Sequence, residues 1–113
     1  MSKGSDILDR LLTHAVAITK LCNELTKNRA TTHIAGQLLR SGTAAAPNYA
    51  EARAGESRQD FIHKLGIVLK ELNESLVWLE MLRRTNAAPS GSLGPLVDEC
   101  DQLCRIIETS IKT

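Results

Sequence analysis

Aromatic residues are scarce in this chain: its 113 residues include one Phe, one Trp and one Tyr, 3% in all. Apolar residues nevertheless make up 42%, so the core must consist of Leu, Ile, Val and Ala. Because strands draw on aromatic and β-branched residues, this composition favours helix over sheet. The length favours one domain over residues 1–113, just large enough to bury a single core.

The chain also lacks an excess of charge, a long apolar run and a cysteine framework. A formal net charge of +1 argues against strong, sequence-independent attraction to nucleic acid, although the N-terminal half is mildly basic. No apolar run approaches the length of a membrane span, and no secretory signal precedes the first helix. Cys22, Cys100 and Cys104 do not have disulfide-framework spacing. We therefore expect a reduced, cytoplasmic protein without a membrane partner.

Apolar periodicity predicts a helix at each end of the chain. The first should begin after Ser5, a favourable N-cap, and end at residues 27–29. The last should begin with Pro95 in its first turn, after a turn-rich loop at residues 86–94. The two apolar stripes comprise Ile7, Leu8, Leu11, Leu12, Ala15, Ile18, Thr19, Cys22 and Leu25, and Leu96, Cys100, Leu103, Ile107 and Ile111.

The second helix should run from Thr31 or Thr32 to about Ala54, with a bend at residues 43–47, because the interior Pro47 removes a backbone hydrogen bond.

Ser57 and Asp60 stand at capping-box spacing and predict a third helix from Arg58 to about Arg84. The apolar residues of this helix that should face the core, at heptad-like spacing, are Phe61, Leu65, Val68, Leu69, Leu72, Leu76, Leu79 and Leu82. Short connections make sequential helices antiparallel. The sequence thus predicts an all-α, antiparallel up-down four-helix bundle whose second helix is kinked near Pro47.

Polar residues form a line along the second helix, at steps of three or four residues. In one interpretation they hydrogen-bond to a neighbouring helix or subunit and fix its register. In the other they contact a ligand, and the flanking arginines suggest a phosphate backbone. The line comprises Gln37, Ser41, Ala44, Asn48, Glu51 and Gly55; the interface or ligand-contact candidates are Gln37, Arg40, Ser41, Asn48, Glu51, Arg53 and Arg58.

The third helix carries a second stripe largely outside its core arc. A bundle helix needs one buried face, so a further mixed apolar and acidic stripe indicates a subunit interface. Alternatively, Trp78 caps the bundle core beside the long loop. The subunit-interface candidates are Ile67, Glu71, Glu74, Trp78 and Met81.

Signatures of catalysis or metal binding are missing. His14, His33 and His63 are scattered, and Cys100 and Cys104 lie beside an apolar face. The carboxylates lack the Glu-x-x-His pairs of diiron bundles, and Ser41 lacks a His/Asp relay. We expect no enzymatic activity, cofactor, metal or small-molecule substrate. Ion pairs are expected instead, Lys70–Glu74 on one turn, and Glu51 with Arg40, Arg53 or Arg58.

The segment QLLRSGTAAAPNYAEA (37–52), followed by DFIHKLGIVLKELNESLVWLEML (60–82), closely resembles the bacterial four-helix-bundle proteins of the 23S rRNA intervening-sequence family. The match spans roughly residues 34–84, with Ala44 where the family usually has Ser and Ala52 where many members have Gly. The matching residues are Gln37, Arg40, Ser41, Asn48 and Glu51 on the second helix, and Lys70, Glu71, Glu74 and Trp78 on the third.

The resemblance implies a ring-shaped homopentamer. A related branch serves diversity-generating retroelements as an accessory protein that binds a reverse transcriptase and its RNA, but those relatives are more basic. We therefore expect a non-enzymatic, homo-oligomeric helical scaffold, with RNA or a nucleic-acid-processing protein as candidate partners. In the ring, the polar line of the second helix and the second stripe of the third helix would face neighbouring subunits or the central pore. The alternative is a structural or protein-binding oligomer that does not contact nucleic acid.

Overall fold

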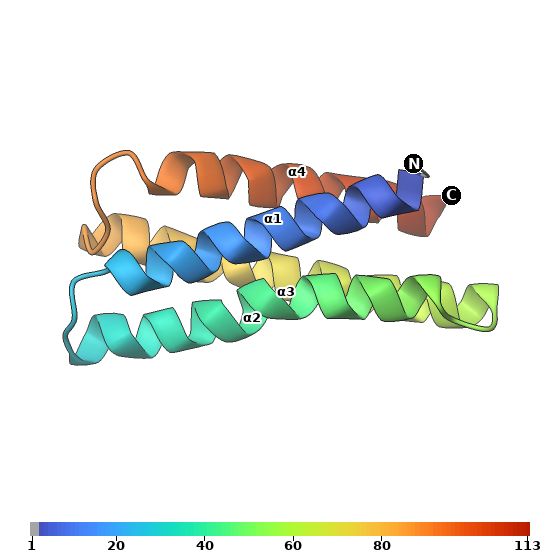
Figure 1. The fold of residues 1–113 in the computed structure, drawn as a ribbon, viewed down its shortest axis with the longest axis horizontal. Helices are drawn as coiled ribbons and strands as arrows, with labels where there is room; N and C mark the ends of the chain where they lie inside the picture. Colours follow the sequence, from blue (N-terminus) through green and yellow to red (C-terminus); the bar gives the residue numbers. More distant parts are fainter. Residues whose placement is uncertain (1–2) are drawn as a thin grey trace.

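The computed structural model describes residues 3–113, which form four helices joined by short connections (Figure 1). The helices are α1 (Lys3–Glu24), α2 (Arg29–Arg53), α3 (Arg58–Thr85) and α4 (Leu93–Lys112). Each connection reverses the chain, so successive helices run antiparallel in a bundle 45 Å long. The predicted all-α four-helix bundle is confirmed. Within the described residues, no helix is long and apolar enough to cross a membrane.

Two helices begin earlier than the sequence suggested. α1 is already helical at Lys3, so the prediction that Ser5 is its N-cap is wrong. α2 starts at Arg29, because the side chain of Asn28 accepts a hydrogen bond from the backbone N–H of Thr31 at 2.9 Å. That cap satisfies one of the unpaired N–H groups of the first turn and fixes the start of the helix.

The end of α1 also differs, since the helix stops at Glu24 and not at residues 27–29. The starts of α3 and α4 agree with expectation. Ser57 caps α3 by accepting a hydrogen bond from the N–H of Asp60 at 3.0 Å. Pro95 lies in the first turn of α4. α2 continues as one helix through Pro47, while the bend expected there stays a prediction.

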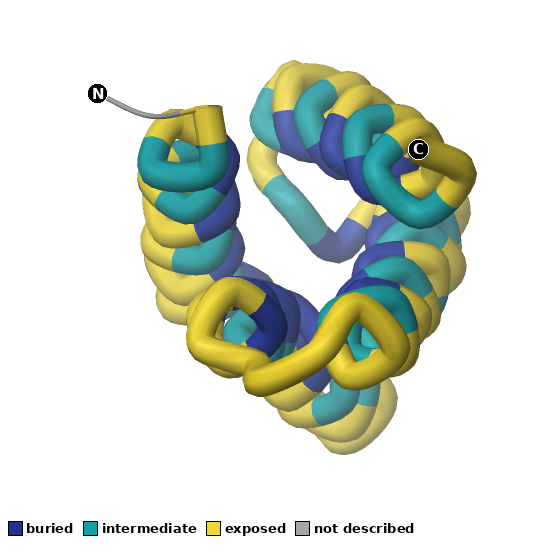
Figure 2. The backbone as a smooth tube through the Cα atoms, turned by 90° about the vertical axis from the view of Figure 1, so that its right-hand side faces the viewer, coloured by how far each residue is buried: buried dark blue, intermediate teal, exposed yellow. Residues whose placement is uncertain are grey.

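The core is mainly aliphatic, with Tyr49 as its one nearly fully buried aromatic ring among the described residues, and it occupies the inner faces of the four helices (Figure 2). On α1 the predicted stripe is partly wrong: Leu12 is 49% exposed and Thr19 is exposed, whereas Leu21 and His14 are buried. The ring of His14 is only 3% exposed, and neither of its nitrogens has a hydrogen-bond partner among the described residues. Burial therefore lowers the pKa of His14.

The helices do not pack equally closely. α2 packs extensively against α1 and α3, and α4 packs mainly on α3, whereas the α1–α4 contact is thin. In the end-on view of Figure 2, α1 and α3 occupy diagonal corners. The α1–α4 side is linked by an ion pair in which Arg10 Nη2 lies 2.6 Å from Glu99 Oε1. Because α1 and α3 are diagonal, their outer faces point to opposite sides of the bundle.

Candidate functional site

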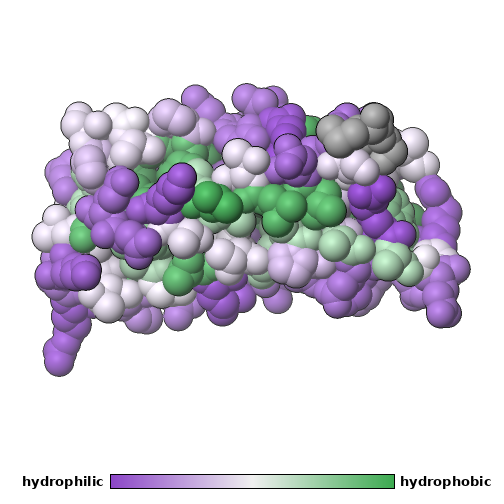
Figure 3. All heavy atoms as spheres, in the orientation of Figure 1, coloured by the Kyte–Doolittle hydropathy of each residue, from purple (hydrophilic) through white to green (hydrophobic). Residues whose placement is uncertain are grey.

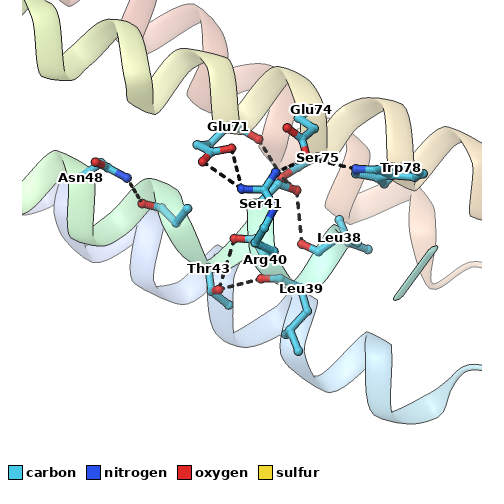
Figure 4. A network of polar contacts seen from close by, with 11 residues as sticks. Leu38, Leu39, Arg40, Ser41, Thr43, Asn48, Glu71, Glu74, Ser75 and Trp78 are labelled. Carbon is cyan, nitrogen blue, oxygen red and sulfur yellow. Dashed lines mark hydrogen bonds and ion pairs between the residues drawn. The ribbon is translucent and has the colours of Figure 1, made fainter. Parts of the chain in front are cut away.

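Only part of the polar line of α2 meets α3: Ser41 contacts Ser75, and the flanking Arg40 binds two carboxylates of the second stripe. We call this polar contact between the two helices the Arg40 seam (Figure 4). At its centre Ser41 Oγ and Ser75 Oγ share a hydrogen bond of 2.9 Å, and both residues are fully buried. Ser75 Oγ also contacts the carbonyl of Glu71 at 2.9 Å, and Ser41 Oγ that of Leu38 at 3.3 Å. Ser41 is thus enclosed between two helices and is not exposed to a ligand.

Beside the serines, Arg40 of α2 binds two carboxylates of α3. Its Nη1 donates to Glu71 at 3.3 Å and 3.4 Å, and its Nη2 donates to Glu74. Glu71 is only 9% exposed, so this pairing compensates a buried negative charge. Hydrogen bonds from Arg40, then from Trp78, lower the pKa of Glu74. Arg40 is therefore engaged within the chain rather than presented to a phosphate.

The tryptophan lies over the same seam. Trp78 Nε1 donates to Glu74 at 3.3 Å, and its ring meets His33 edge-on, with centroids 6.2 Å apart. Both Trp78 and Ile67 are partly buried, whereas Met81 remains 41% exposed. The stripe thus divides into an inner part that packs on α2 and an outer part that reaches solvent.

The remaining polar residues of α2 do not form one connected group. Asn48 Nδ2 donates to the carbonyl of Ala44 in its own helix at 2.9 Å. Gln37 is partly buried, and Glu51 is exposed, with its carboxylate 3.9 Å from Lys64 Nζ.

The predicted ion pairs differ from those observed. Glu74 pairs with Arg40 across the seam rather than with Lys70, whose charge has only a weaker effect on its pKa. Glu51 faces Lys64 of α3. Sequence spacing shows which residues are neighbours on one helix, but contacts between helices depend on their register.

Sequence reasoning missed Ser75, His33 and Lys64. A signal for Ser75 was present, since it stands three residues after Leu72 and four before Leu79, within the core arc of α3. A hydroxyl at such a position needs a polar partner on the facing helix. His33 and Lys64 had no comparable signal in the sequence, because their contacts with Trp78 and Glu51 depend on how α2 and α3 pack against each other.

The thiols of Cys100 and Cys104 are buried and hydrogen-bonded within the bundle. Cys100 Sγ donates to the carbonyl of Leu72 at 3.3 Å, and Cys104 Sγ donates to Asn73 Oδ1 at 3.5 Å. The neighbouring thiol of Cys104, together with burial, raises the pKa of Cys100. Over residues 3–113, no group of three or more His, Cys, Asp or Glu side chains is placed to hold a metal ion.

Arg53 and Arg58, the other predicted cations, come together at one end of the bundle. With Lys3 they line an open pocket of about 730 Å³ where α1 and α3 begin and α2 and α4 end. A Cβ on Gly4 would lie 2.8 Å from Arg53 Nε, so a larger residue there would make this flexible side chain shift from its place against α1. No Asp or Glu occurs among the described residues that line the pocket.

Comparison with known proteins agrees with this architecture. Residues 4–109 match the family described as 23S rRNA-intervening sequence protein. A crystal structure of a protein with unknown function from the S23 ribosomal protein family of Bacteroides thetaiotaomicron superimposes with a TM-score of 0.90. The two chains are 35% identical, and the match covers 99% of this chain and 100% of that chain. No curated protein matches. Neither description states an enzymatic activity, and the chain belongs to the 23S rRNA-intervening sequence protein family.

Proposed function

We propose that this protein is a non-enzymatic helical scaffold that assembles with copies of itself into a ring of five subunits, the number that its family resemblance implies. The supporting observation is the exposure of large apolar side chains on two outer faces. Leu12 and Val16 of α1 are 49% and 52% exposed, and Val77 and Met81 of α3 are 54% and 41% exposed. Clustered apolar surface of this kind is typical of protein contacts.

The first face, which we call the α1 surface, consists of Leu12, Val16 and Leu39. Figure 3 shows apolar side chains gathered in a band along α1. Leu39, 38% exposed, lies four residues after Ala35, and Ala35 accepts a hydrogen bond from Cys22 of α1. Leu39 therefore projects from the flank of α2 next to α1 and extends the band.

The second face, the α3 surface, consists of Leu76, Val77 and Met81. With Glu80 and Arg84 these residues line a shallow hollow of about 370 Å³. Glu80 and Arg84 pair at 2.9 Å and give the hollow a polar rim. An apolar centre with a charged rim is the usual composition of a protein interface.

The placement of these surfaces favours a ring. They lie on the outer faces of diagonal helices, so one copy can present its α1 surface to the α3 surface of the next. Contacts between two different surfaces are heterologous, and they close into a ring when the rotation per subunit divides a full turn. A two-fold dimer would bury one surface against itself and leave the other exposed.

Light scattering on a size-exclusion column tests the assembly. We expect a particle of about five times the 12.3 kDa monomer mass. Leu12→Glu and Val77→Glu should each reduce that mass, because every contact uses one surface of each kind. Gln59→Glu, at an exposed position of α3, is the matched control and should keep it. A monomeric wild type, or full assembly of both acidic variants, overturns the proposal; circular dichroism checks that each variant is folded.

A second candidate function is contact with RNA, directly or through a nucleic-acid-processing protein. The observation that favours it is the grouping of Lys3, Arg53 and Arg58 at one bundle end, which a ring would repeat five times. Total RNA should then shift the particle on the same column, and salt should reverse the shift. Absence of a salt-reversible shift leaves the alternative, a structural or protein-binding oligomer that does not contact nucleic acid.

A further inference from the structure

We propose that the occupant of the α3 surface is α1 of a second copy, lying parallel to α3, with Val16 opposite Val77 and Asp9 opposite Lys70. The proposal rests on the assembly proposed above and adds to it the direction and the register of the contact. Within one chain α1 and α3 do not touch, so their outer faces are available to a neighbouring copy.

The two valines mark the centres of the outer faces. Val16 is 52% exposed and Val77 is 54% exposed. Each stands two residues before a fully buried residue, Ile18 on α1 and Leu79 on α3. Two residues turn a helix by about 200°, so both valines point almost directly away from the core. Helices that meet through these faces therefore bring the two valines together.

A charge accompanies each valine at the same spacing. Asp9 stands seven residues before Val16, and Lys70 stands seven residues before Val77. Seven residues cover about 10 Å and return to the same side of a helix within about 20°. Both side chains are exposed, and neither forms an ion pair among the described residues. Parallel helices with the valines opposite each other would place this carboxylate beside this ammonium group.

Beyond the valines the same register matches two further pairs of opposite charge. Lys20 and Glu24 follow the valine of α1 by four and eight residues. Glu80 and Arg84 follow the valine of α3 by three and seven residues. Each pair differs in height by one residue, about 1.5 Å along the axis. The apolar centre is thus flanked by complementary charges on both sides, as in specific protein interfaces.

An antiparallel contact fits the charges less well. With the valines opposite each other, it would bring Asp9 to Arg84, which already pairs with Glu80 at 2.9 Å. It would also bring Lys70 opposite Asn23, which carries no charge. The parallel contact therefore satisfies more of the charges that have no partner within one chain.

The direction of the helices leads to the same arrangement independently. Successive helices are antiparallel, so α1 and α3 of one chain run the same way (Figure 1). Rotation about a ring axis that lies along the bundles keeps this direction, so each α1 meets the α3 of the next copy in parallel. A two-fold axis across the helices would reverse it.

Cross-linking of introduced cysteines tests the register in the full-length protein. The background is Cys22→Ser, which removes the partly exposed native thiol, and the reagent is a short bismaleimide. Val16→Cys with Val77→Cys, and Asp9→Cys with Lys70→Cys, should each give a ladder of linked copies on a denaturing gel. Asp9→Cys with Arg84→Cys is the antiparallel pair and should give none.

Exchange of charges tests the pairing energetically. Asp9→Lys and Lys70→Glu should each raise the protein concentration at which the particle dissociates, by at least about fivefold, because like charges then meet. The double variant restores opposite charges and should return this concentration to the wild-type value. Glu108→Lys, at an exposed position of α4, is the matched control and should not change it.

Failure of the register is distinguishable from failure of the assembly. A wild type that is monomeric by light scattering overturns the proposed assembly and the parallel contact together. If the particle forms, the parallel contact is overturned when either expected pair gives no ladder, or when the antiparallel pair gives one. It is equally overturned if the double charge exchange does not restore the wild-type concentration, and in these cases the assembly itself remains.

Discussion

Gly42 of α2 is a position where adding one methyl group should destabilise the bundle. A Cβ there would lie 2.7 Å from Ile18 Cδ1 and 2.9 Å from Ile18 Cγ2. Both distances are well inside the contact distance of two carbon atoms, about 3.5–4.0 Å. Ile18 is fully buried in α1, and its β-branched side chain is restricted at χ1. The overlap must therefore be relieved by moving the helices apart.

Two opposing effects set the magnitude. Replacing Gly by Ala inside a helix stabilises it by about 1 kcal/mol, whereas overpacking a core costs about 1–3 kcal/mol. Because two atoms of a stiff side chain overlap, the overpacking cost should lie in the upper part of its range and exceed the gain in helix propensity. Gly42→Ala should therefore lower the free energy of unfolding by about 1 kcal/mol. Gly36 is the matched control: it lies exposed in the same helix, and a Cβ there meets nothing within 4 Å. Gly36→Ala should therefore raise the free energy of unfolding by about 1 kcal/mol.

Urea unfolding at fixed protein concentration measures these differences, and the background of Ile18→Ala gives the decisive comparison. That substitution removes both overlapping atoms and costs about 2–5 kcal/mol by itself. In its presence Gly42→Ala should become stabilising, because helix propensity is gained without a clash. The reasoning is refuted if Gly42→Ala stabilises the wild type as Gly36→Ala does, or if the sign of its effect does not reverse.

Three further predictions follow from buried polar groups and thiols. The folded state keeps His14 neutral, so the free energy of unfolding should fall as the pH drops below about 6.5, where the unfolded chain takes up a proton. His14→Leu should flatten this dependence in urea titrations at about pH 7.5 and pH 5. Ser75→Ala should cost about 1 kcal/mol, and a double-mutant cycle with Ser41→Ala should show a sub-additive loss. Cys22 is partly exposed and burial raises its pKa, so iodoacetamide should alkylate it slowly in the folded protein. Cys100 is buried and should react only after unfolding. Mass spectrometry measures the number of alkylated thiols in each state.

The fold could be predicted because apolar periodicity and caps are local properties of the sequence. Ser57 is an example, since its spacing to Asp60 correctly predicted where α3 starts.

The errors on α1 concern the start of the helix and the choice of its buried face. Ser5 is a favourable cap, but the helix already extends before it. Leu12 was placed in the core by its hydrophobicity, whereas the packing of α1 against α2 and α4 turns His14 inward instead.

The contacts of the candidate site could be predicted only in part. Arg40 and Glu71 were each singled out, yet 31 positions separate them, and no local spacing predicts that they pair. Arg53 and Arg58 were grouped with Arg40 because all three flank the polar line of the second helix. The structure separates them, since α2 ends at Arg53 and α3 starts at Arg58, beyond the reach of the Arg40 seam.

Several of the residues through which this chain resembles its family also join α2 to α3. Ser41 meets Ser75 in the core, and Arg40 binds Glu71 and Glu74 across the same seam. A buried polar pair that stays satisfied in only one register penalises any slip of one helix along the other. The motif therefore accounts for the alignment of the two helices without requiring a ligand. The proposed assembly would instead use surfaces that the motif leaves outside, namely the α1 surface and the α3 surface.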